Sequence, residues 1–368
     1  MIRLRGWRRA VPTAAVVSLV TLGSSLATSP ALAAGSSTTS HWRVDFRSGV
    51  SGLYSFYDAL TVSGRSAAWA VGGRGVAGYG SPIAAVWRNG HWSATRMPSK
   101  AVGSLQAVSA DSPNDAWAVS VGDVLHWHAG TWTVARTWSL KQGPPGKLVT
   151  GVQAFSPTNV WVFGGTQYGL GTWHLRGGKW KKLTGAGRDI AAVSALSSTN
   201  MWAIGGASSG SLLHYVKGNW QTVSSPALTG LNFGAILATS PASVWVTASP
   251  ADGTPGFRLL HLHGNQWTSY AIPWDLSVSS TTPDGAPDNS IASAGHGSFW
   301  IATGNNTATT KWLLHFGAGG AWSRVKLGAD VMFGVARRPA SGSLFGVGET
   351  PQGKTGYTDA IWAYGTTS

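Results

Sequence analysis

Short apolar segments centred on an aromatic residue recur along the chain, and polar, glycine-rich stretches separate them. Seven copies align, at residues 68–72, 116–119, 160–164, 201–205, 244–246, 299–301 and 344–348, the last with Phe345 in place of Trp. Their average spacing is about 46 residues, a period typical of repeat architectures. In residues 160–163 apolar side chains occupy both alternating positions, which predicts a strand buried on both faces.

Three further strands are expected in each repeat. A second aromatic series comprises Trp42, Trp92, Trp132, Trp180, Trp220, Trp267 and Trp322, again about 47 residues apart. An apolar segment lies between the two series, as at 213–215, and a small apolar run such as 105–110 precedes each copy of the first series. Four short strands at this period predict a β-propeller blade, and seven repeats predict seven blades.

The two ends of the repeat region are expected to share a blade. The first strand, at 41–46, belongs to the outermost series, whereas the last strand, at 360–365, is a third strand. We therefore predict that residues 41–366 form an all-β, seven-bladed β-propeller with four antiparallel strands per blade. In this arrangement the N-terminal strand closes the last blade.

Residues 1–33 have the pattern of a secretory signal peptide. Arginines at positions 3, 5, 8 and 9 precede the apolar run 14–20, and small residues at 31–33 suit cleavage. The run is too short and too interrupted by Ser, Thr and Gly to span a membrane. Arg8 and Arg9 leave both general and twin-arginine export open. We expect a polar linker at 34–40 and a secreted, extracellular mature protein.

Composition excludes several classes of protein. The chain has no Cys, which excludes disulfide scaffolds and cysteine ligands or nucleophiles. Its single Glu, Glu349, argues against a coiled coil or a long helical array. Hydrophobic residues make up 43% of the chain and 21 residues are Trp, which is enough for a large core. The sequence contains no phosphate loop, dinucleotide fingerprint, nucleophile elbow or HExxH motif.

The repeat resembles a known group of proteins. Residues 112–119, 156–164 and 198–205 share a serine, a turn residue and a Trp-centred strand, followed by Leu-His-aromatic and Gly-x-Trp sequences. This phrase is similar to that of the secreted kelch-like and BNR-like propeller proteins common in actinobacteria, over the whole mature chain. The resemblance implies the fold and no catalytic residue. No repeat contains the Asp-box of sialidases, so the likeness to sialidases is one of architecture only.

Repeated polar residues in the blades are expected to be structural. Five of the ten histidines occupy one position in the third strand: His126, His174, His214, His261 and His315. A side chain repeated around a ring indicates a structural role, pointing outward or bonding a neighbouring blade, so we expect no metal and no cofactor. Two residues before the first-series aromatic lie Asp115, Asn159, Asn200, Ser243, Ser298 and Ser343. These turn formers are expected to bond nearby backbone.

A candidate ligand site lies where the longest connections meet. Those connections run from an outer strand to the next inner strand, and they share one face, the loop-rich face, with the loops between second and third strands. The candidate ligand-binding residues there are Trp138, Trp274, Asp275, Tyr79, Tyr168 and Tyr357, with Tyr54 and Tyr57 before the first inner strand. Aromatic rings with a polar group suit the apolar faces of sugars. That the rings merely pack on their own loops is an equally open interpretation.

Carboxylates leave a catalytic alternative open. Those expected on the loop-rich face are Asp123, Asp252, Asp275, Asp284, Asp288, Glu349 and Asp359. A glycosidase needs two carboxyl groups about 5–9.5 Å apart. A polysaccharide-active hydrolase or lyase that uses rim carboxylates such as Asp252 or Asp275 is therefore the alternative function. Residues 284–289 lack the spacing of a calcium loop.

The net charge of +14 bears on the partner. Basic residues are scattered, and the protein is expected outside the cell. Attraction to anionic wall polymers, screened by salt, is therefore favoured over nucleic-acid binding. We expect a monomeric binding or scaffold propeller without a membrane span. Its ligand on the loop-rich face is a carbohydrate, a cell-wall polymer or a surface protein.

Overall fold

The computed structural model of the chain describes residues 41–48, 54–75, 80–138, 149–166, 170–185, 187, 189–206, 210–254, 256–274, 290–302, 311–338, 343–353 and 356–365. All of them belong to one compact unit, Ser40–Ser368. The expected signal peptide and linker, residues 1–40, lie outside the described residues. Those two boundaries stay predictions.

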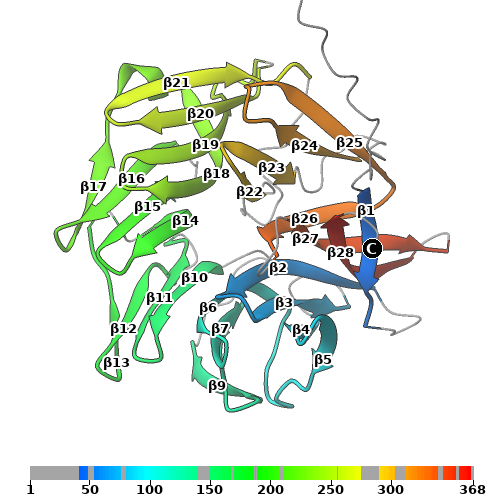
Figure 1. The fold of residues 1–368 in the computed structure, drawn as a ribbon. Coiled ribbons are helices and arrows are strands. Elements are labelled where there is room, and N and C mark those ends of the chain that lie inside the picture. Colours follow the sequence, from blue (N-terminus) through cyan, green and yellow to red (C-terminus); the bar gives the residue numbers. More distant parts are fainter. Residues whose placement is uncertain are drawn as a thin grey trace, which may run out of the picture. The chain divides into compact units, whose positions relative to one another are not determined.

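The described residues form seven four-stranded antiparallel sheets, which are the seven predicted blades (Figure 1). Blades 1 to 3, from the innermost strand outward, are β2 (Ser55–Ser63), β3 (Ala67–Arg74), β4 (Ser81–Arg88), β5 (His91–Thr95); β6 (Leu105–Ser112), β7 (Asp115–Ser120), β8 (Asp123–His128), β9 (Thr131–Thr137); and β10 (Val149–Ser156), β11 (Asn159–Gly164), β12 (Trp173–Arg176), β13 (Lys179–Lys182).

Blades 4 to 6 repeat the same order. They are β14 (Ile190–Ser197), β15 (Asn200–Gly205), β16 (Ser211–Val216), β17 (Asn219–Val223); β18 (Leu231–Ser240), β19 (Ser243–Pro250), β20 (Arg258–His263), β21 (Gln266–Ala271); and β22 (Ser290–Gly295), β23 (Ser298–Ala302), β24 (Lys311–Phe316), β25 (Trp322–Gly328). A short 3-10 helix, η2 (Pro226–Leu228), connects blades 4 and 5. The side chain of Ser225 caps it by accepting a hydrogen bond from the Ala227 N–H.

Blade 7 is closed by the N-terminal strand, as the sequence predicted. Its order is β1 (His41–Phe46), β28 (Gly356–Gly365), β27 (Leu344–Gln352) and β26 (Val331–Arg337). Strand β1 pairs antiparallel with β28, with Trp42 opposite Tyr364 (Figure 1). Because both ends of the repeat region are held in one sheet, the ring has no free strand at its seam.

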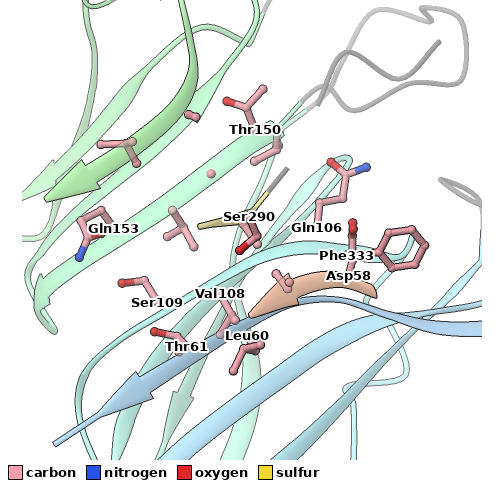
Figure 2. A pocket seen from close by; sticks show the side chains of 18 of the residues that line it. Asp58, Leu60, Thr61, Gln106, Val108, Ser109, Thr150, Gln153, Ser290 and Phe333 are labelled. Atoms are coloured by element: carbon pink, nitrogen blue, oxygen red, sulfur yellow. The ribbon is translucent and has the colours of Figure 1, made fainter. Parts of the chain in front are cut away.

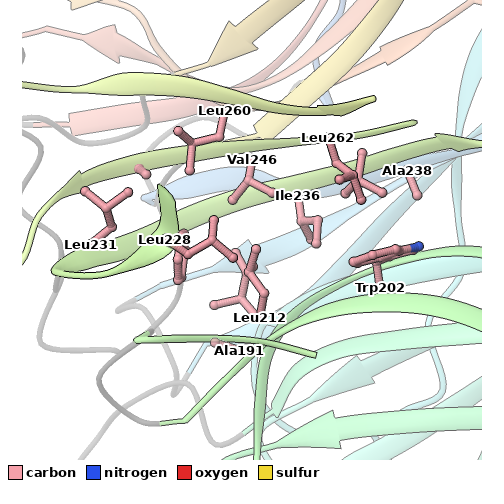
Figure 3. Packing of buried hydrophobic residues seen from close by; sticks show 14 residues of the cluster. Ala191, Trp202, Leu212, Leu228, Leu231, Ile236, Ala238, Val246, Leu260 and Leu262 are labelled. Carbon is pink, nitrogen blue, oxygen red and sulfur yellow. The ribbon is translucent and has the colours of Figure 1, made fainter. Parts of the chain in front are cut away.

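Apolar cores lie between neighbouring blades. Among the described residues there are seven hydrophobic clusters, and each draws its side chains from two adjacent blades. Figure 3 shows the cluster between blades 4 and 5, where Leu212 and Ile236 meet beside Trp202. The second strand of a blade contributes to two of these cores. In β7, Ala116 and Ala118 face blade 1 while Trp117 and Val119 face blade 3, which confirms the predicted burial on both faces.

The innermost strands are bonded to one another around the axis. In three places a serine hydroxyl accepts a hydrogen bond from the inner strand of the next blade: Ser109 from the Ala154 N–H, Ser194 from the Ala238 N–H and Ser290 from the Val335 N–H. Each first strand also has a register shift against its second strand, such as the one between Tyr57 and Ala59. These bulges bend the inner strands where they approach the axis.

The repeated histidines lie in five different blades, and each has its partners inside its own blade. Each ring packs on the aromatic residue opposite it in the second strand, with ring centroids 3.6–4.5 Å apart. Each Nε2 also lies 2.6–3.1 Å from the side chain of Asp115, Asn159, Asn200, Ser243 or Ser298. These contacts agree with the expected structural role, but the partners lie in the histidine's own blade and not in a neighbouring one. These turn formers therefore bond the rings, whereas the side chains that accept hydrogen bonds from nearby backbone in the turns are those of Ser112, Ser156 and Ser197.

The two faces of the propeller carry different kinds of connection. The loop-rich face carries the connections between blades and the loops between second and third strands. We call the opposite face, which carries the tight turns between first and second and between third and fourth strands, the turn face. Within the part of the chain that the structure describes, no helix combines the length and the hydropathy needed to cross a bilayer.

Candidate functional site

A polar channel runs along the propeller axis. Its cavity of about 440 Å³ is lined by six of the seven innermost strands, β2, β6, β10, β14, β22 and β26. Figure 2 shows Asp58, Gln106, Thr150 and Phe333 at one side of it and Thr61, Ser109 and Gln153 farther along. Asp58 and Gln106 lie near the starts of their strands, so this end of the channel opens on the loop-rich face. The lining is mixed polar and small apolar, which suits hydroxyl or amide groups better than a purely apolar ligand.

A row of aromatic rings leads from the rim of blades 7 and 1 to this mouth. The ring of Tyr357 lies 5.7 Å from that of Tyr54, which lies 5.8 Å from that of Phe56, and Phe56 lies 6.3 Å from Phe333. Two of the three contacts are edge-to-face, the arrangement that aromatic pairs prefer. Phe333 lines the channel beside Asp58 (Figure 2). The row thus connects an exposed tyrosine to the channel without a break.

Tyr54 is held at its hydroxyl by the only glutamate of the chain. Glu349 on β27 is hydrogen-bonded to the Tyr54 side chain and is only 5% exposed, whereas Tyr54 is 37% exposed. Burial, together with the nearby negative charge of Asp58, raises the pKa of Glu349 to about 7, although the Tyr54 hydrogen bond and Lys311 act in the opposite direction. Burial and Glu349 likewise raise the pKa of Tyr54. Glu349 therefore positions the ring from beneath, and its own carboxyl does not reach the surface.

A second buried carboxylate secures the strand that carries Tyr54. Asp359 on β28 is fully buried, and its Oδ1 accepts hydrogen bonds from the hydroxyls of Ser48 at 2.6 Å and Ser55 at 2.7 Å. Its Oδ2 accepts the Ser48 N–H at 2.7 Å. Because Ser55 begins β2, these bonds fix the first strand of blade 1 to blade 7 next to the aromatic row. Asp359 has no oxygen left for a ligand in this arrangement.

Of the six predicted ligand-binding residues, three lie outside the described residues: Tyr79, Tyr168 and Asp275. Trp138 is only 9% exposed and belongs to the core between blades 2 and 3, where its ring lies 5.7 Å from that of Trp173. Trp274 packs partly against the core between blades 5 and 6, with the Arg324 guanidinium 4.9 Å from its ring centroid. These contacts favour the interpretation that both tryptophans pack on their own surroundings.

Tyr357 is the predicted residue that the structure joins to the aromatic row, and Tyr54 was expected on the same face. Tyr57, in contrast, is fully buried. The sequence analysis missed Phe56 and Phe333, since both look like ordinary residues of apolar inner strands. Contact between them joins blade 1 to blade 7, and ring closure is the only feature of the sequence that brings those blades together.

The described carboxylates on the loop-rich face have structural partners. Asp123 accepts hydrogen bonds from the Val102 N–H at 3.1 Å and the Thr137 hydroxyl at 2.7 Å. Asp252 accepts two from Thr254, which lower the pKa of its carboxyl. Glu349 and Asp359 are opposite each other on β27 and β28, but both are buried. Asp275, Asp284 and Asp288 lie outside the described residues, so the catalytic alternative stays a hypothesis.

Exposed hydrophobic side chains also concentrate on the loop-rich face. Among the described residues three large ones are exposed: Val44 at 40%, Tyr54 at 37% and Val102 at 69%. Val44 lies on the outer strand β1, whereas Tyr54 and Val102 precede the inner strands β2 and β6 on the loop-rich face. Val102 is held there by Asp123 and by Ser120, whose hydroxyl donates to the Val102 carbonyl at 2.8 Å.

Comparisons with known proteins identify the fold. No family model and no curated protein sequence matches the chain. Among solved structures, YCF48 bound to D1 peptide is 14% identical, with a TM-score of 0.58 over 89% of this chain and 97% of that one. YCF48 from Cyanidioschyzon merolae is 15% identical, with a TM-score of 0.57 over 88% and 98%. The RRP9 WD40 repeats are 13% identical, with a TM-score of 0.57 over 89% and 97%. At these identities the likeness establishes a seven-bladed β-propeller, and the kelch-like or BNR-like repeat type rests on the sequence resemblance alone.

Proposed function

We propose that this protein is an exported binding propeller that holds a polymer across the loop-rich face, at the channel mouth where blades 7 and 1 meet. The observation that carries the proposal is the continuous row from Tyr357 through Tyr54 and Phe56 to Phe333. Within this row Tyr54 is exposed, and its hydroxyl is held by the buried carboxyl of Glu349. A rigid aromatic surface beside polar groups loses little entropy on binding. That is the property expected of a recognition site.

A carbohydrate or anionic cell-wall polymer is the ligand class that this surface fits best. The exposed ring of Tyr54 offers an apolar platform for a sugar face. Asp58, Gln106 and Thr150 line the channel beyond it and offer partners for hydroxyl groups. Removal of the four arginines in residues 1–33, a segment without acidic residues, takes the formal net charge from +14 to +10, and this charge would draw an anionic polymer toward the mature protein over a distance set by the ionic strength. Tyr79, Tyr168 and Asp275, which lie outside the described residues, remain proposed contacts.

A protein segment is the competing ligand for the same surface. The similar propeller YCF48 has been solved bound to D1 peptide, and propellers commonly present loops to extended partners. Aromatic residues and an exposed valine suit a peptide as well as a sugar. The described carboxylates favour binding over catalysis, because Asp123, Asp252, Glu349 and Asp359 are all engaged within the protein.

Export is part of the proposal. The basic start, apolar run and small residues of positions 1–33 support secretion of a mature chain that begins near residue 34. N-terminal sequencing of the protein recovered from culture medium tests it. Recovery of uncleaved protein in the cell fraction alone would contradict export.

Binding is tested by retention of the mature protein on cellulose, chitin and purified bacterial cell wall, at low and high salt. The variant Tyr54→Ala removes the exposed platform, and Val44→Ala is its control because Val44 is exposed to a similar degree on an outer strand. The double variant Trp138→Ala/Trp274→Ala tests the tryptophans that the sequence favoured. We expect retention that survives high salt in the wild type and in Val44→Ala and falls at least about tenfold in Tyr54→Ala.

Three outcomes would overturn the proposal in different ways. Equal retention of wild type and Tyr54→Ala would refute the site. Loss of retention of every form at high salt would show that net charge alone is responsible. Absence of retention on any polysaccharide, together with Tyr54-dependent capture of a peptide, would replace the carbohydrate by a protein partner at the same site.

A further inference from the structure

Blade 2 departs from the other blades on the turn face. The residue two positions before the central aromatic is Asp115 in this blade, whereas blade 1 carries Ala67 and blades 3 to 7 carry Asn or Ser at this position. Its third strand, β8, also ends with a second histidine, His128. In the antiparallel register Asp115 lies opposite His128, and Trp117 lies opposite His126. Residues two apart in a strand share a face, so all four side chains project from the same side of the sheet.

The three polar side chains converge on one carboxylate oxygen. His126 Nε2 lies 2.6 Å and His128 Nδ1 lies 3.4 Å from Asp115 Oδ2. One nitrogen of each ring and a carboxylate oxygen fall within 4.8 Å of one another. The other oxygen, Oδ1, accepts a hydrogen bond from the Trp117 indole at 3.1 Å, which orients the carboxylate. The Asp115 side chain is 5% exposed and that of His128 is 69% exposed, so the cluster has a buried base and an open side.

We propose that Asp115, His126 and His128 bind a divalent transition-metal ion, with Zn²⁺ as the representative ion. Two imidazole nitrogens and one carboxylate oxygen are a donor set that such ions accept, and three protein ligands leave a position for water or a further ligand. Ligand atoms around tetrahedral zinc lie about 3.4 Å apart, given metal–ligand distances of about 2.0–2.2 Å. The His128–Asp115 distance of 3.4 Å already fits this arrangement. Binding would require the distance between His126 Nε2 and Asp115 Oδ2 to open from 2.6 Å to about this value.

An ion pair alone accounts for only part of this arrangement. His126 is stacked on Trp117 and bonded to Asp115, like its counterparts in the other blades. That bond does not require a second, largely exposed histidine near the same oxygen. Trp117, by contrast, acts as a second-sphere residue, since hydrogen bonds to the ligating carboxylate are the usual way in which proteins fix metal ligands.

A further carboxyl group adjoins the cluster. Asp111, at the end of β6, is hydrogen-bonded to Asp115 through its side chain, and its Oδ1 is buried with no hydrogen-bond partner among the described residues. Asp111 is therefore a neighbouring acidic group whose charge a bound cation would offset.

Blade 5 provides a comparison within the same chain. It has the same pair of histidines, His261 and His263, whose ring centroids are 5.8 Å apart compared with 5.7 Å for His126 and His128. In the position of Asp115 it carries Ser243, which lies 3.0 Å from His261. The histidine pair therefore recurs without a carboxylate. Only blade 2, among the described residues, combines all three donors. The expectation of no metal treated the five repeated histidines as equivalent.

Titration of the untagged, metal-free mature protein with Zn²⁺ by calorimetry tests the site, and Co²⁺ absorption provides a second signal. We compare the wild type with Asp115→Asn, His128→Ala and the control His263→Ala. Asp115→Asn gives blade 2 the residue found at Asn159 and Asn200, so the blade is expected to fold, and circular dichroism checks this. We expect one equivalent to bind to the wild type and to His263→Ala, with affinity at least about tenfold lower in the other two variants.

The proposal would be overturned if the folded wild type shows no saturable binding of Zn²⁺. It would also be overturned if Asp115→Asn and His128→Ala both retain wild-type affinity, or if His263→Ala weakens binding as much as they do. None of these results affects the proposed ligand site on the loop-rich face, because the cluster lies on the turn face.

Discussion

Replacing Glu349 by Gln measures how much the buried, ionised carboxylate beneath Tyr54 reduces the stability of the protein. The carboxyl is 5% exposed, and its pKa is about 7 in the folded protein compared with 4.5 for the unperturbed group. Since the folded-state pKa is raised, the native state holds more protons than the unfolded state between these two values. Stability from this group is therefore full below about pH 4.5 and falls as the pH rises toward 7.

The size of the effect follows from the same pKa values. A difference of one pKa unit corresponds to about 1.4 kcal/mol, so the pKa difference of Glu349 costs about 3 kcal/mol of folding free energy once the group is ionised. Gln retains an acceptor for the Tyr54 hydroxyl and cannot ionise. The variant should therefore be more stable than the wild type by about 3 kcal/mol at pH 8, and this advantage should disappear near pH 4.5.

The assay is urea unfolding followed by tryptophan fluorescence at pH 4.5, 6 and 8. Taking the difference between variant and wild type at each pH removes the titration of all other groups. Asp252→Asn is the control on the same face, because hydrogen bonds from Thr254 lower the pKa of Asp252 and its removal should give no gain at pH 8. The reasoning would be refuted if the difference in unfolding free energy between Glu349→Gln and the wild type is the same at pH 4.5 and 8, or if the wild type is more stable than the variant at pH 8.

Three more predictions concern the ring and its repeated contacts. Ser109→Ala leaves the buried Ala154 N–H without its acceptor and should lower the free energy of unfolding by about 1–3 kcal/mol in urea titrations. A change within experimental error would contradict a stabilising hydrogen bond between these blades. Gly72→Ala places a Cβ against the carbonyl of Phe56 and should lower the free energy of unfolding by on the order of 1–3 kcal/mol. An unchanged thermal unfolding midpoint would show that the two strands are less closely spaced. Burial, and secondarily Arg176, lowers the pKa of His174 to about 4. Its imidazole should therefore titrate near pH 4 by NMR, and its contribution to stability should rise with pH between about 4 and 6.5. A titration midpoint near 6.5 would instead place the ring in solvent.

The fold could be predicted because each repeat contains the same kind of strand, one that must be buried on both faces. Residues 160–163 are apolar in both phases, and a strand of this kind is stable only between two layers. Seven such strands at one period leave few arrangements other than a ring. The closure of blade 7 was predictable from the same repeat. Trp42 belongs to the outermost series, so the strand that contains it needs three inner strands from the other end of the repeat region.

The candidate site was predicted only in part. Alternation of loops between the two faces correctly placed Tyr54, Tyr357 and Glu349 together, because it depends on strand order alone. Which rings touch depends on side-chain packing between blades 1 and 7, so Phe56 and Phe333 were missed. Trp138 is buried because Trp173 and Trp180 from blade 3 enclose it, and no pattern within its own loop indicates those neighbours.

The cluster in blade 2 carried a sequence signal that was overlooked. Asp115 and Trp117 alternate in one strand, and His126 and His128 alternate in the next. In an antiparallel pair joined by a short loop, two such patterns face each other. The repeat itself concealed this, because the comparison of blades drew attention to the position that His126 shares with four other blades and away from His128.

The central claim, that a polymer binds across the loop-rich face at the junction of blades 7 and 1, is tested most directly by hydroxyl-radical footprinting. The mature protein would be oxidised with and without solubilised bacterial cell-wall polysaccharide, and protection would be measured for each residue. We predict that Tyr54, Tyr357 and Val102 are protected, whereas Val44 on the outer strand and His128 on the turn face are not. Protection confined to Val44, His128 or other sites away from the channel mouth would contradict the account.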